Sequence, residues 1–298
     1  MIGVSHVTRK SPSISLVTPS FNRVQFLRQA VESILTQQYA ALEYVLVDGA
    51  STDGSAEVVA SYADRLHWWI SEPDGGQYEA LNKGFAQTTG EVMGWLNSDD
   101  LHLPWTLSIV GEIFATFPEI EWLTTAFPLT WDAQGRAVGC TYRGGFSRSG
   151  FLRGEYLPTG RSYATGFMQQ ESTFWRRDLW QRCGGKLDIR YPLAADFDLW
   201  MRFSKEAQPY AVEVPLAGFR SHGAQRTSDW SAYLEDASAS FANHGGDAYN
   251  AIETLAQRAI LARLPRRARR WAAGAGLVSR RPVCAYGGAQ LGWYIDER

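Results

Sequence analysis

The sequence predicts an α/β fold with a mostly parallel central sheet flanked by helices, and two observations carry that prediction. Over residues 13–101, short apolar runs typical of buried strands alternate with segments in which apolar residues recur at helical spacing. Two of these runs, 44–47 and 91–96, pass directly into acidic and turn-forming residues. Buried parallel strands have continuous apolar runs, and ligands bind beyond their carboxyl ends. The sequence therefore predicts a binding site at one edge of a parallel sheet.

The first half of the chain predicts right-handed strand–helix–strand units. Asn22 is a suitable N-cap for the first helix. Asp53 is either an N-cap for the second helix or a ligand-binding residue, and both interpretations stay open. The predicted elements are strands at 13–18, 42–47, 66–70 and 91–96, with helices after residue 22, after residue 54 and at 77–87.

After residue 101 the pattern changes. Residues 104–117 predict a helix with proline in its first turn, and 195–203 predict another. The irregular segment 120–165 is expected to receive a second substrate. From about residue 230 the chain is alanine-rich and then strongly basic, which suits either an anionic membrane surface or an extension that is solvated or forms a homodimer.

The composition is that of a folded globular protein. The chain has 298 residues, 45% hydrophobic and 20% charged, which suits one large domain or a domain with an extension. A net charge of −2 gives no general attraction to nucleic acid. Three widely spaced cysteines argue against disulfides and a zinc site, and favour a reducing compartment. No apolar stretch approaches the roughly 20 residues that span a bilayer. We expect a cytoplasmic protein, with peripheral contact to the inner face of the membrane as an option.

Five motifs occur in an order that resembles the family-2 glycosyltransferases, which are inverting enzymes with a GT-A fold. The resemblance implies a GT-A domain at 13–229, with a nucleotide-binding half at 13–101 and an acceptor-binding half at 102–229. A helical, basic C-terminal extension at 230–298 would follow. The motifs are Thr18-Pro19-Ser20-Phe21-Asn22, Val47-Asp48-Gly49-Ala50-Ser51-Thr52-Asp53-Gly54, Ser71-Glu72-Pro73-Asp74-Gly75-Gly76, Asn97-Ser98-Asp99-Asp100 and Ala195-Asp196-Phe197-Asp198-Leu199-Trp200-Met201-Arg202.

The resemblance also implies a binding site for a nucleotide sugar. Asp48 would accept a hydrogen bond from the nucleobase. Asp74 would contact the nucleoside, unless it is only a turn aspartate between Pro73 and Gly75. Lys83 either compensates for a phosphate-binding arginine that many relatives carry at the position of Leu81, or is a solvated helix residue. The remaining donor-binding candidates are Thr18, Pro19, Asn22, Asn97 and Ser98.

Residues Asn97-Ser98-Asp99 stand where the family has its DxD metal motif. A Mg2+ or Mn2+ ion on the donor diphosphate would neutralise the charge of the leaving group, and such ions prefer carboxylate oxygens. Asp99 is the expected ligand, while Asn97 departs from the motif and Asp100 is a ligand or a turn residue. His222 is either a second metal ligand or a structural histidine. Nearby Arg220 and Arg226 are suited to bind diphosphate oxygens.

An inverting transfer needs one base to take the proton of the acceptor hydroxyl. Asp196 matches the base of the family motif, although Ala195 replaces the glutamate that often precedes it. Asp198 would point about 200° away around a helix and pair with Arg202. Gln170, Glu171 and Trp175 are acceptor-binding candidates, with a surface glutamate before a core strand as the alternative.

The expected activity is transfer of a sugar from a nucleoside diphosphate, most simply UDP, to a hydroxyl of a glycan or lipid-linked acceptor. Two alternatives stay open. A nucleotidyltransferase would be expected to carry a glycine-rich basic loop after its first strand, where this chain has Pro19-Ser20-Phe21-Asn22. A non-catalytic sugar-nucleotide or glycan-binding module would be compatible with Asn97 and Ala195.

Overall fold

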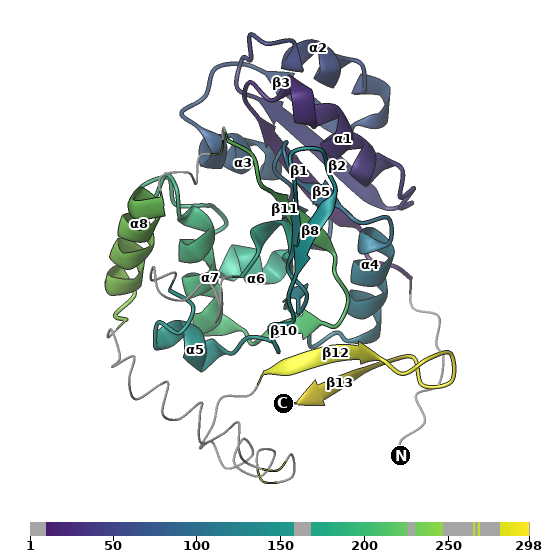
Figure 1. The fold of residues 1–298 in the computed structure, drawn as a ribbon, viewed down its shortest axis with the longest axis vertical. Coiled ribbons are helices and arrows are strands. Elements are labelled where there is room, and N and C mark those ends of the chain that lie inside the picture. Colours follow the sequence, from purple (N-terminus) through teal and green to yellow (C-terminus); the bar gives the residue numbers. More distant parts are fainter. Residues whose placement is uncertain are drawn as a thin grey trace.

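The computed structural model describes residues 10–157, 168–223, 225, 230–246, 265, 268 and 281–297. Within these residues, a nine-stranded sheet runs through the molecule and helices cover both of its faces (Figure 1). The strands, in their order across the sheet, are β13 (Trp293–Glu297), β12 (Pro282–Tyr286), β10 (Pro209–Val212), β6 (Trp122–Thr125), β9 (Phe174–Arg176), β4 (Val92–Trp95), β1 (Ile14–Ser20), β2 (Leu42–Asp48) and β3 (Trp68–Ser71).

The predicted fold class is confirmed, because the sheet is mostly parallel. Strand β1 pairs in parallel with β2 and β4, and β3 continues the parallel half beyond β2. Strands β9 and β13 run antiparallel to their neighbours. The chain leaves β1 toward β2 and β3, and then returns to the other side of β1 as β4. A change of direction of this kind opens a crevice at the carboxyl ends of β1, β2 and β4.

The two faces of the sheet bury two separate hydrophobic cores. Along β1, Leu16 packs into one core and Val17 into the other, as the two-residue repeat of a strand requires. Helices α1 (Val24–Leu35), α2 (Ser55–Ala60) and α4 (Thr106–Thr116) cover one face. The opposite face packs against α3 (Gln77–Phe85), α5 (Arg148–Leu152), α6 (Arg177–Arg182), α7 (Ala195–Glu206) and α8 (Trp230–Asn243). Two 3₁₀ turns, η1 (Ala63–Arg65) and η2 (Gln170–Ser172), complete the helical elements of the described residues.

A second sheet of four short strands lies beside the crevice. Its order is β5 (Leu101–His102), β11 (Ala217–Arg220), β7 (Leu129–Trp131) and β8 (Ala137–Cys140). The sequence suggests strand-like pieces near β6 and β8, but β5 is too short to show a pattern. Strand β5 nevertheless helps to form the site, because it begins immediately after Asp100 and pairs antiparallel with β11. This pairing draws the residues that follow β11 toward the end of β4.

The C-terminal region differs from the predicted helical extension. Helix α8 lies where helical structure was expected, but residues 282–297 form the hairpin β12–β13. Strand β12 joins the edge of the main sheet next to β10, with Val283 and Cys284 fully buried. The apolar run at 282–286 is too short to distinguish strand from helix by periodicity alone. The basic segment 263–271, apart from Pro265 and Ala268, lies outside the described residues.

No helix among the described residues is long and apolar enough to cross a membrane.

Candidate active site

Asp48, at the end of β2, organises the loop that follows it. Its Oδ1 accepts a hydrogen bond from the Ser51 hydroxyl at 2.5 Å, and its Oδ2 accepts from the Ser51 amide at 2.9 Å and the Ser71 hydroxyl at 2.6 Å. The side chain is 0% exposed. The predicted direct contact between Asp48 and a nucleobase therefore does not fit this arrangement, since the carboxylate is occupied by the protein itself.

Asp74 lies close to this loop and is more accessible than Asp48. A Cβ atom built on Gly49 would come within 3.2 Å of the Asp74 carboxylate and 3.3 Å of the Phe21 ring, so the two side chains flank the same glycine. Burial raises the pKa of Asp74, and the neighbouring charges of Glu79 and Asp48 add to that effect. Phe21 is 59% exposed. An acidic group and an open aromatic face thus stand together at the mouth of the crevice.

The turn after β1 is shaped differently from the prediction. Asn22 adopts a left-handed conformation with φ of 51°, and its Oδ1 accepts a hydrogen bond from the Thr52 amide. The N-cap of α1 is Arg23, and Asp53 accepts a hydrogen bond from the Val24 amide. Asn22 therefore joins the two loops of the crevice and does not cap the helix.

Three further donor-binding candidates are buried. Thr18 is fully buried, and its hydroxyl accepts a hydrogen bond from the Tyr44 hydroxyl at 3.0 Å. Pro19 and Ser98 are buried as well. These residues support the backbone of the crevice, and their side chains are not available to a ligand in this structure.

Lys83 forms an ion pair with Glu72 and lies near enough to Asp74 for their charges to interact. The Nζ atom donates a hydrogen bond to Glu72 Oε1 at 2.5 Å, and this contact raises the pKa of Lys83. Whether Lys83 also binds phosphate stays a prediction, while the alternative of a residue without a partner does not hold.

Asp99 and His222, the two predicted metal ligands, lie side by side. Asp99 Oδ2 is 3.1 Å from His222 Nε2 and 3.3 Å from Arg23 Nε. The ring of His222 is held against Phe26 of α1, with 4.5 Å between ring centroids. The β5–β11 pairing brings these residues together from positions more than 120 apart in the chain.

The Asp99–His222 pair fits a divalent cation. The pair offers a carboxylate oxygen and an imidazole nitrogen, two atom types that bind divalent ions, and in this structure these atoms lie at hydrogen-bond distance, 3.1 Å. Within the described residues, no cluster of three or more His, Cys, Asp or Glu side chains could hold a metal. The remaining ligands would therefore be diphosphate oxygens and water, as is usual for magnesium-type sites.

Asn97 and Asp100 form a chain of hydrogen bonds behind this pair. Gln77 Nε2 donates to Asn97 Oδ1 at 2.8 Å, and Asn97 Nδ2 donates to Asp100 Oδ2 at 3.1 Å. The other oxygen of Asp100 accepts from the Arg220 amide at 2.8 Å. Burial, and then the charges of Glu171 and Asp99, hold the pKa of Asp100 well above its usual range. Asp100 is thus a structural residue, and an amide at position 97 avoids a second carboxylate beside it.

Glu171 is a buried acid that lies between the two parts of the site. It is 3% exposed, and its Oε1 has no hydrogen-bond partner among the described residues. Burial, with a smaller contribution from the charges of Asp196 and Asp99, raises its pKa to about 8. Both aspartates are therefore close enough for their charges to act on the same carboxyl group. The alternative of a surface glutamate is wrong for this residue.

Asp196, the predicted base, lies in the first turn of α7 and is 7% exposed. The Tyr233 hydroxyl lies 3.4 Å from its Oδ1 and 3.5 Å from its Oδ2, and Tyr78 also hydrogen-bonds to it. Burial raises the pKa of Asp196 to about 6, although these hydrogen bonds partly oppose the shift. A carboxylate with this pKa is ionised at neutral pH and still basic enough to take a proton.

Asp198 has the predicted structural role. Its Oδ2 accepts a hydrogen bond from Arg202 Nε at 2.9 Å. The position that resembles part of the family's acidic motif therefore contributes to helix packing.

Trp175 and Gln170 do not face an acceptor. Trp175 is 0% exposed and packs edge-to-face against Trp95 and beside Trp200 in the aromatic core. Gln170 is buried and donates to the Trp95 carbonyl at 2.6 Å. Strand β9 passes through the middle of the sheet, so both of its faces are covered, and the predicted acceptor contact of Trp175 is wrong.

Arg220 is buried beside the site and does not lie open to a diphosphate. Its guanidinium lies 4.8 Å from the centre of the Phe26 ring, and none of its nitrogens has a hydrogen-bond partner among the described residues. Burial lowers the pKa of Arg220, while the nearby Asp100 and Asp99 carboxylates oppose that effect. Arg226 lies outside the described residues.

Sequence reasoning missed Arg23, Phe21, Tyr78 and Tyr233. Phe21 belongs to the first motif and Arg23 directly follows it, so their position next to Asn22 was the available signal. Nothing in the sequence connects Tyr233 with Asp196, because they lie on different helices.

Comparison with known proteins identifies the region that carries the crevice. Residues 15–123 match the model of a family described as Glycosyl transferase family 2. Two Mycobacterium tuberculosis proteins, each described as an uncharacterized glycosyltransferase, are 27% identical over 233 residues. The match covers 76% of this chain and 82% of each relative.

Solved structures share the fold. A fragment of S. aureus TarS in complex with UDP-GlcNAc has a TM-score of 0.56 and 16% identity, covering 72% of this chain. This chain spans only 60% of that fragment. The mannosyltransferase PcManGT from Pyrobaculum calidifontis, in complex with GDP-Man and Mn2+, has a TM-score of 0.50 and 18% identity. That match covers 88% of this chain and 83% of the other.

Proposed function

Because this chain is a family-2 glycosyltransferase with a GT-A fold, we propose that it transfers a sugar from a nucleoside diphosphate to a hydroxyl group and inverts the anomeric carbon. The observation that carries the proposal is the position of helix α3, whose Gln77 donates to Asn97 at 2.8 Å while the next residue, Tyr78, donates to the Leu193 carbonyl just before α7 at 3.1 Å. The predicted metal motif and the helix that holds the buried Asp196 therefore belong to one site. The effect of both Asp99 and Asp196 on the pKa of the buried Glu171 supports the same conclusion.

The donor is proposed to bind along the carboxyl ends of β1, β2 and β4. Asp74 and Phe21 would face the nucleoside, since they are the accessible acidic and aromatic groups at the mouth of the crevice. Arg23 and the Asp99–His222 pair would face the diphosphate. A divalent cation held by that pair would supply positive charge to the diphosphate as it leaves. Mg2+ and Mn2+ are both candidates, and the structural neighbour PcManGT is in complex with Mn2+.

Asp196 is proposed to act as the general base. The acceptor oxygen bonds to the anomeric carbon as the bond from that carbon to the diphosphate oxygen breaks. The acceptor proton passes to Asp196, and the nucleoside diphosphate leaves with the bonding electrons. Because the pKa of Asp196 is about 6, the rate should rise as pH increases through about 6 and then level off.

The acceptor is proposed to be a hydroxyl of a glycan or of a lipid-linked glycan at the inner face of a membrane. The basic segment 263–271 supports contact with an anionic surface. We retain 13–229 as the catalytic domain, to which α8 and β12 are attached by direct packing.

Nucleotide binding can be tested without knowing the acceptor. Thermal-shift measurements with UDP, GDP and dTDP, each with and without Mn2+, should show stabilisation that depends on one nucleotide and on the metal. Asp99→Asn and His222→Ala should remove the Mn2+-dependent part. Asp64→Asn and His67→Ala are matched controls, because both residues are exposed and lie outside the crevice.

Replacement of the base tests the reaction itself. Asp196→Asn should lower transfer by roughly 100-fold to 10,000-fold, the usual contribution of a general base, while nucleotide binding stays unchanged. The measurement is release of the nucleoside diphosphate from the donor that the binding screen selects. Full activity in Asp196→Asn would overturn the assignment of the base. Release of pyrophosphate in place of a nucleoside diphosphate would indicate a nucleotidyltransferase.

A further inference from the structure

Helix α8 and the proposed base Asp196 both lie beyond residues 15–123, the segment matched by the family model, and α8 contacts the base. We propose that α8 is a working part of the active site, in which Tyr233 is a positioning residue that orients the Asp196 carboxylate and stabilises its ionised form. The inference rests on the proposed function only in taking Asp196 as the base.

The contact between Tyr233 and Asp196 is a long, weak hydrogen bond shared between the two carboxylate oxygens, because both distances exceed the roughly 2.5–3.0 Å of an ordinary O–H···O bond. The hydroxyl lies at nearly equal distances, 3.4 Å and 3.5 Å, from the two carboxylate oxygens. Both side chains are buried, so water does not compete for this contact. A hydrogen bond to a buried carboxylate stabilises its charged form, which burial alone would disfavour. Tyr233 therefore opposes the effect of burial on the base.

Tyr233 is suited to this role because it stays protonated. Burial, and then the charges of Asp196 and other neighbours, raise its pKa well above the ordinary tyrosine value. The hydroxyl thus remains a donor over the whole range in which Asp196 titrates. Besides backbone amides of α7, chiefly that of Phe197, the titratable groups that act on Asp196 are Tyr233 on α8, Tyr78 on α3 and Glu171 on η2. Asp236 of α8 acts on Tyr233.

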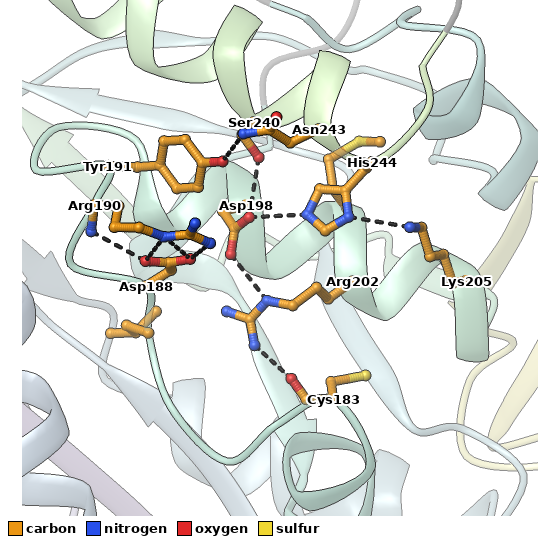
Figure 2. Close-up of polar contacts among 12 residues, drawn as sticks. Cys183, Asp188, Arg190, Tyr191, Asp198, Arg202, Lys205, Ser240, Asn243 and His244 are labelled. Carbon is orange, nitrogen blue, oxygen red and sulfur yellow. Dashed lines mark hydrogen bonds and ion pairs between the residues drawn. The ribbon is translucent and has the colours of Figure 1, made fainter.

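A second set of contacts fixes α8 in the position that this role requires. Figure 2 shows Asp198, two residues after the base, accepting hydrogen bonds or ion pairs from three directions. Ser240 Oγ donates at 3.1 Å, His244 Nε2 lies at 2.9 Å and Arg202 Nε donates at 2.9 Å. Two of these partners, Ser240 and His244, come from α8 or the residue after it. Asp198 therefore joins α7 to α8 at a buried position.

Further bonds continue along the same side of α8. Asp236 Oδ2 accepts from the Leu193 amide at 2.8 Å, and Asn243 Nδ2 donates to the Tyr191 hydroxyl at 2.7 Å (Figure 2). Positions 233, 236, 240 and 243 are three or four residues apart, so they lie on one face of the helix. That face is attached to α7 and to the segment leading into it over the whole length of α8. These hydrogen bonds fix the position of α8 along α7. They therefore also fix the position of the Tyr233 hydroxyl relative to the Asp196 carboxylate.

The test is a direct titration of Asp196 by carbon-13 NMR of the full-length protein carrying carboxyl-labelled aspartate. Asp196→Asn identifies the signal, and no substrate is required. Tyr233→Phe should raise the midpoint of the Asp196 titration by about half a pH unit or more, which is about a threefold change in acid-dissociation constant. The rate of donor turnover should fall near pH 6 and recover at higher pH, with KM for the donor unchanged.

Tyr191→Phe is the matched control. It also removes one tyrosine hydroxyl that bonds to α8, but Tyr191 contacts Asn243 and not the base. Its Asp196 midpoint should stay within about 0.2 units of the native value. Equal Asp196 titration midpoints in the Tyr233→Phe and native proteins would overturn the proposal. Equal shifts of that midpoint in Tyr233→Phe and Tyr191→Phe would also overturn it, because α8 would then have only a structural role.

A second variant covers the case in which Tyr233→Phe does not fold. Replacing Tyr233 by 3-fluorotyrosine keeps the shape of the side chain and strengthens its hydroxyl as a donor. The Asp196 midpoint should then move downward, opposite to the phenylalanine result, and an unmoved midpoint contradicts the proposal. Activity of Asp196→Asn separates the two ideas: a fully active Asp196→Asn enzyme removes the base assignment even when the titration shift is observed.

Discussion

The carboxylates at the crevice differ in what surrounds them. Asp48 is used by neighbouring hydroxyl and amide groups, Asp100 is enclosed by Asn97 and the Arg220 amide, and Asp99 alone of these three faces His222 and Arg23. The sequence shows only that each of these three aspartates comes at or just after the end of a predicted strand. What each carboxylate can bind depends on which of its oxygens already accept hydrogen bonds from the protein.

The amide at position 97 gives the first prediction at this scale. Asn97→Asp removes the Nδ2 donor to Asp100 and places a second carboxyl group 3.1 Å from it. We expect a loss of roughly 1–3 kcal/mol in the free energy of unfolding near neutral pH, from an unmade buried hydrogen bond and charge repulsion. The measurement is the free energy of unfolding of the native and Asn97→Asp proteins, from urea denaturation near neutral pH.

The pH dependence of this loss follows from the sign of the pKa shifts. Two adjacent carboxyl groups have raised pKa values in the folded state, so the folded protein holds protons that the unfolded chain releases. Stability of the variant therefore falls as pH rises, and its loss should be larger at pH 8 than at pH 5. The exchange variant Asn97→Asp with Asp100→Asn serves as the control, because it restores one amide and one acid. No recovery in that variant would contradict the charge explanation.

At the scale of elements, short pieces of backbone bring the site together. Strand β5 has only two residues, but its pairing with β11 carries His222 to Asp99. The first residue of helix α1 is bound by an acid from another loop, because Asp53 accepts a hydrogen bond from the Val24 amide at 3.0 Å. Asp53 also accepts from the amide and hydroxyl of Ser55 at the start of α2. One side chain therefore ties together the beginnings of two helices.

Removing that tie is the second prediction. Asp53→Ala should cost about 0.5–2 kcal/mol of unfolding free energy at pH 7, the usual range for a lost helix cap. Burial alone would raise the pKa of Asp53, but hydrogen bonds from Ser55 and Val24 lower it below its ordinary value. Its contribution is therefore present above the unfolded value and lost as pH falls through the lower folded value.

The measurement is denaturant unfolding at pH 7 and at a series of lower pH values, where the difference in stability between the two proteins should shrink as pH falls. Asp53→Asn is the matched control, because its one amide oxygen keeps either the bonds from Ser55 or the bond from Val24, so its loss should be smaller than that of Asp53→Ala. A loss in Asp53→Ala that is the same at all pH values would argue that the carboxylate is not the active form.

For the whole molecule, the C-terminal hairpin closes one edge of the sheet. Strand β12 covers β10, and Cys284 on β12 packs into the core under α4, with no exposed surface. Burial raises the pKa of Cys284 to about 12, and Cys140 is exposed. The hairpin is thus part of the folded body that holds the crevice.

The third prediction uses the two cysteines as a matched pair. Cys284→Ser should lower the free energy of unfolding by about 1–3 kcal/mol, because a hydroxyl is buried in an apolar site, while Cys140→Ser should change it by less than about 0.5 kcal/mol. In the native protein, a thiol reagent at pH 8 should modify Cys140 rapidly and Cys284 only on unfolding. Rapid labelling of Cys284 would mean that the hairpin is not docked in solution.

The sequence by itself predicted the parallel sheet, the crevice at its carboxyl edge, the resemblance to family-2 glycosyltransferases, and Asp99, His222 and Asp196 as candidate site residues. These follow from local patterns, since an apolar run, its turn and the acid after it lie within a few residues of one another. Tertiary structure decided that Asp48 and Trp175 are enclosed, that Lys83 pairs with Glu72 and that residues 282–297 are strands. It also brought Tyr233 to Asp196. Burial and partnership depend on segments far apart in the chain, so only the folded arrangement sets which carboxylate stays free to bind or to accept a proton.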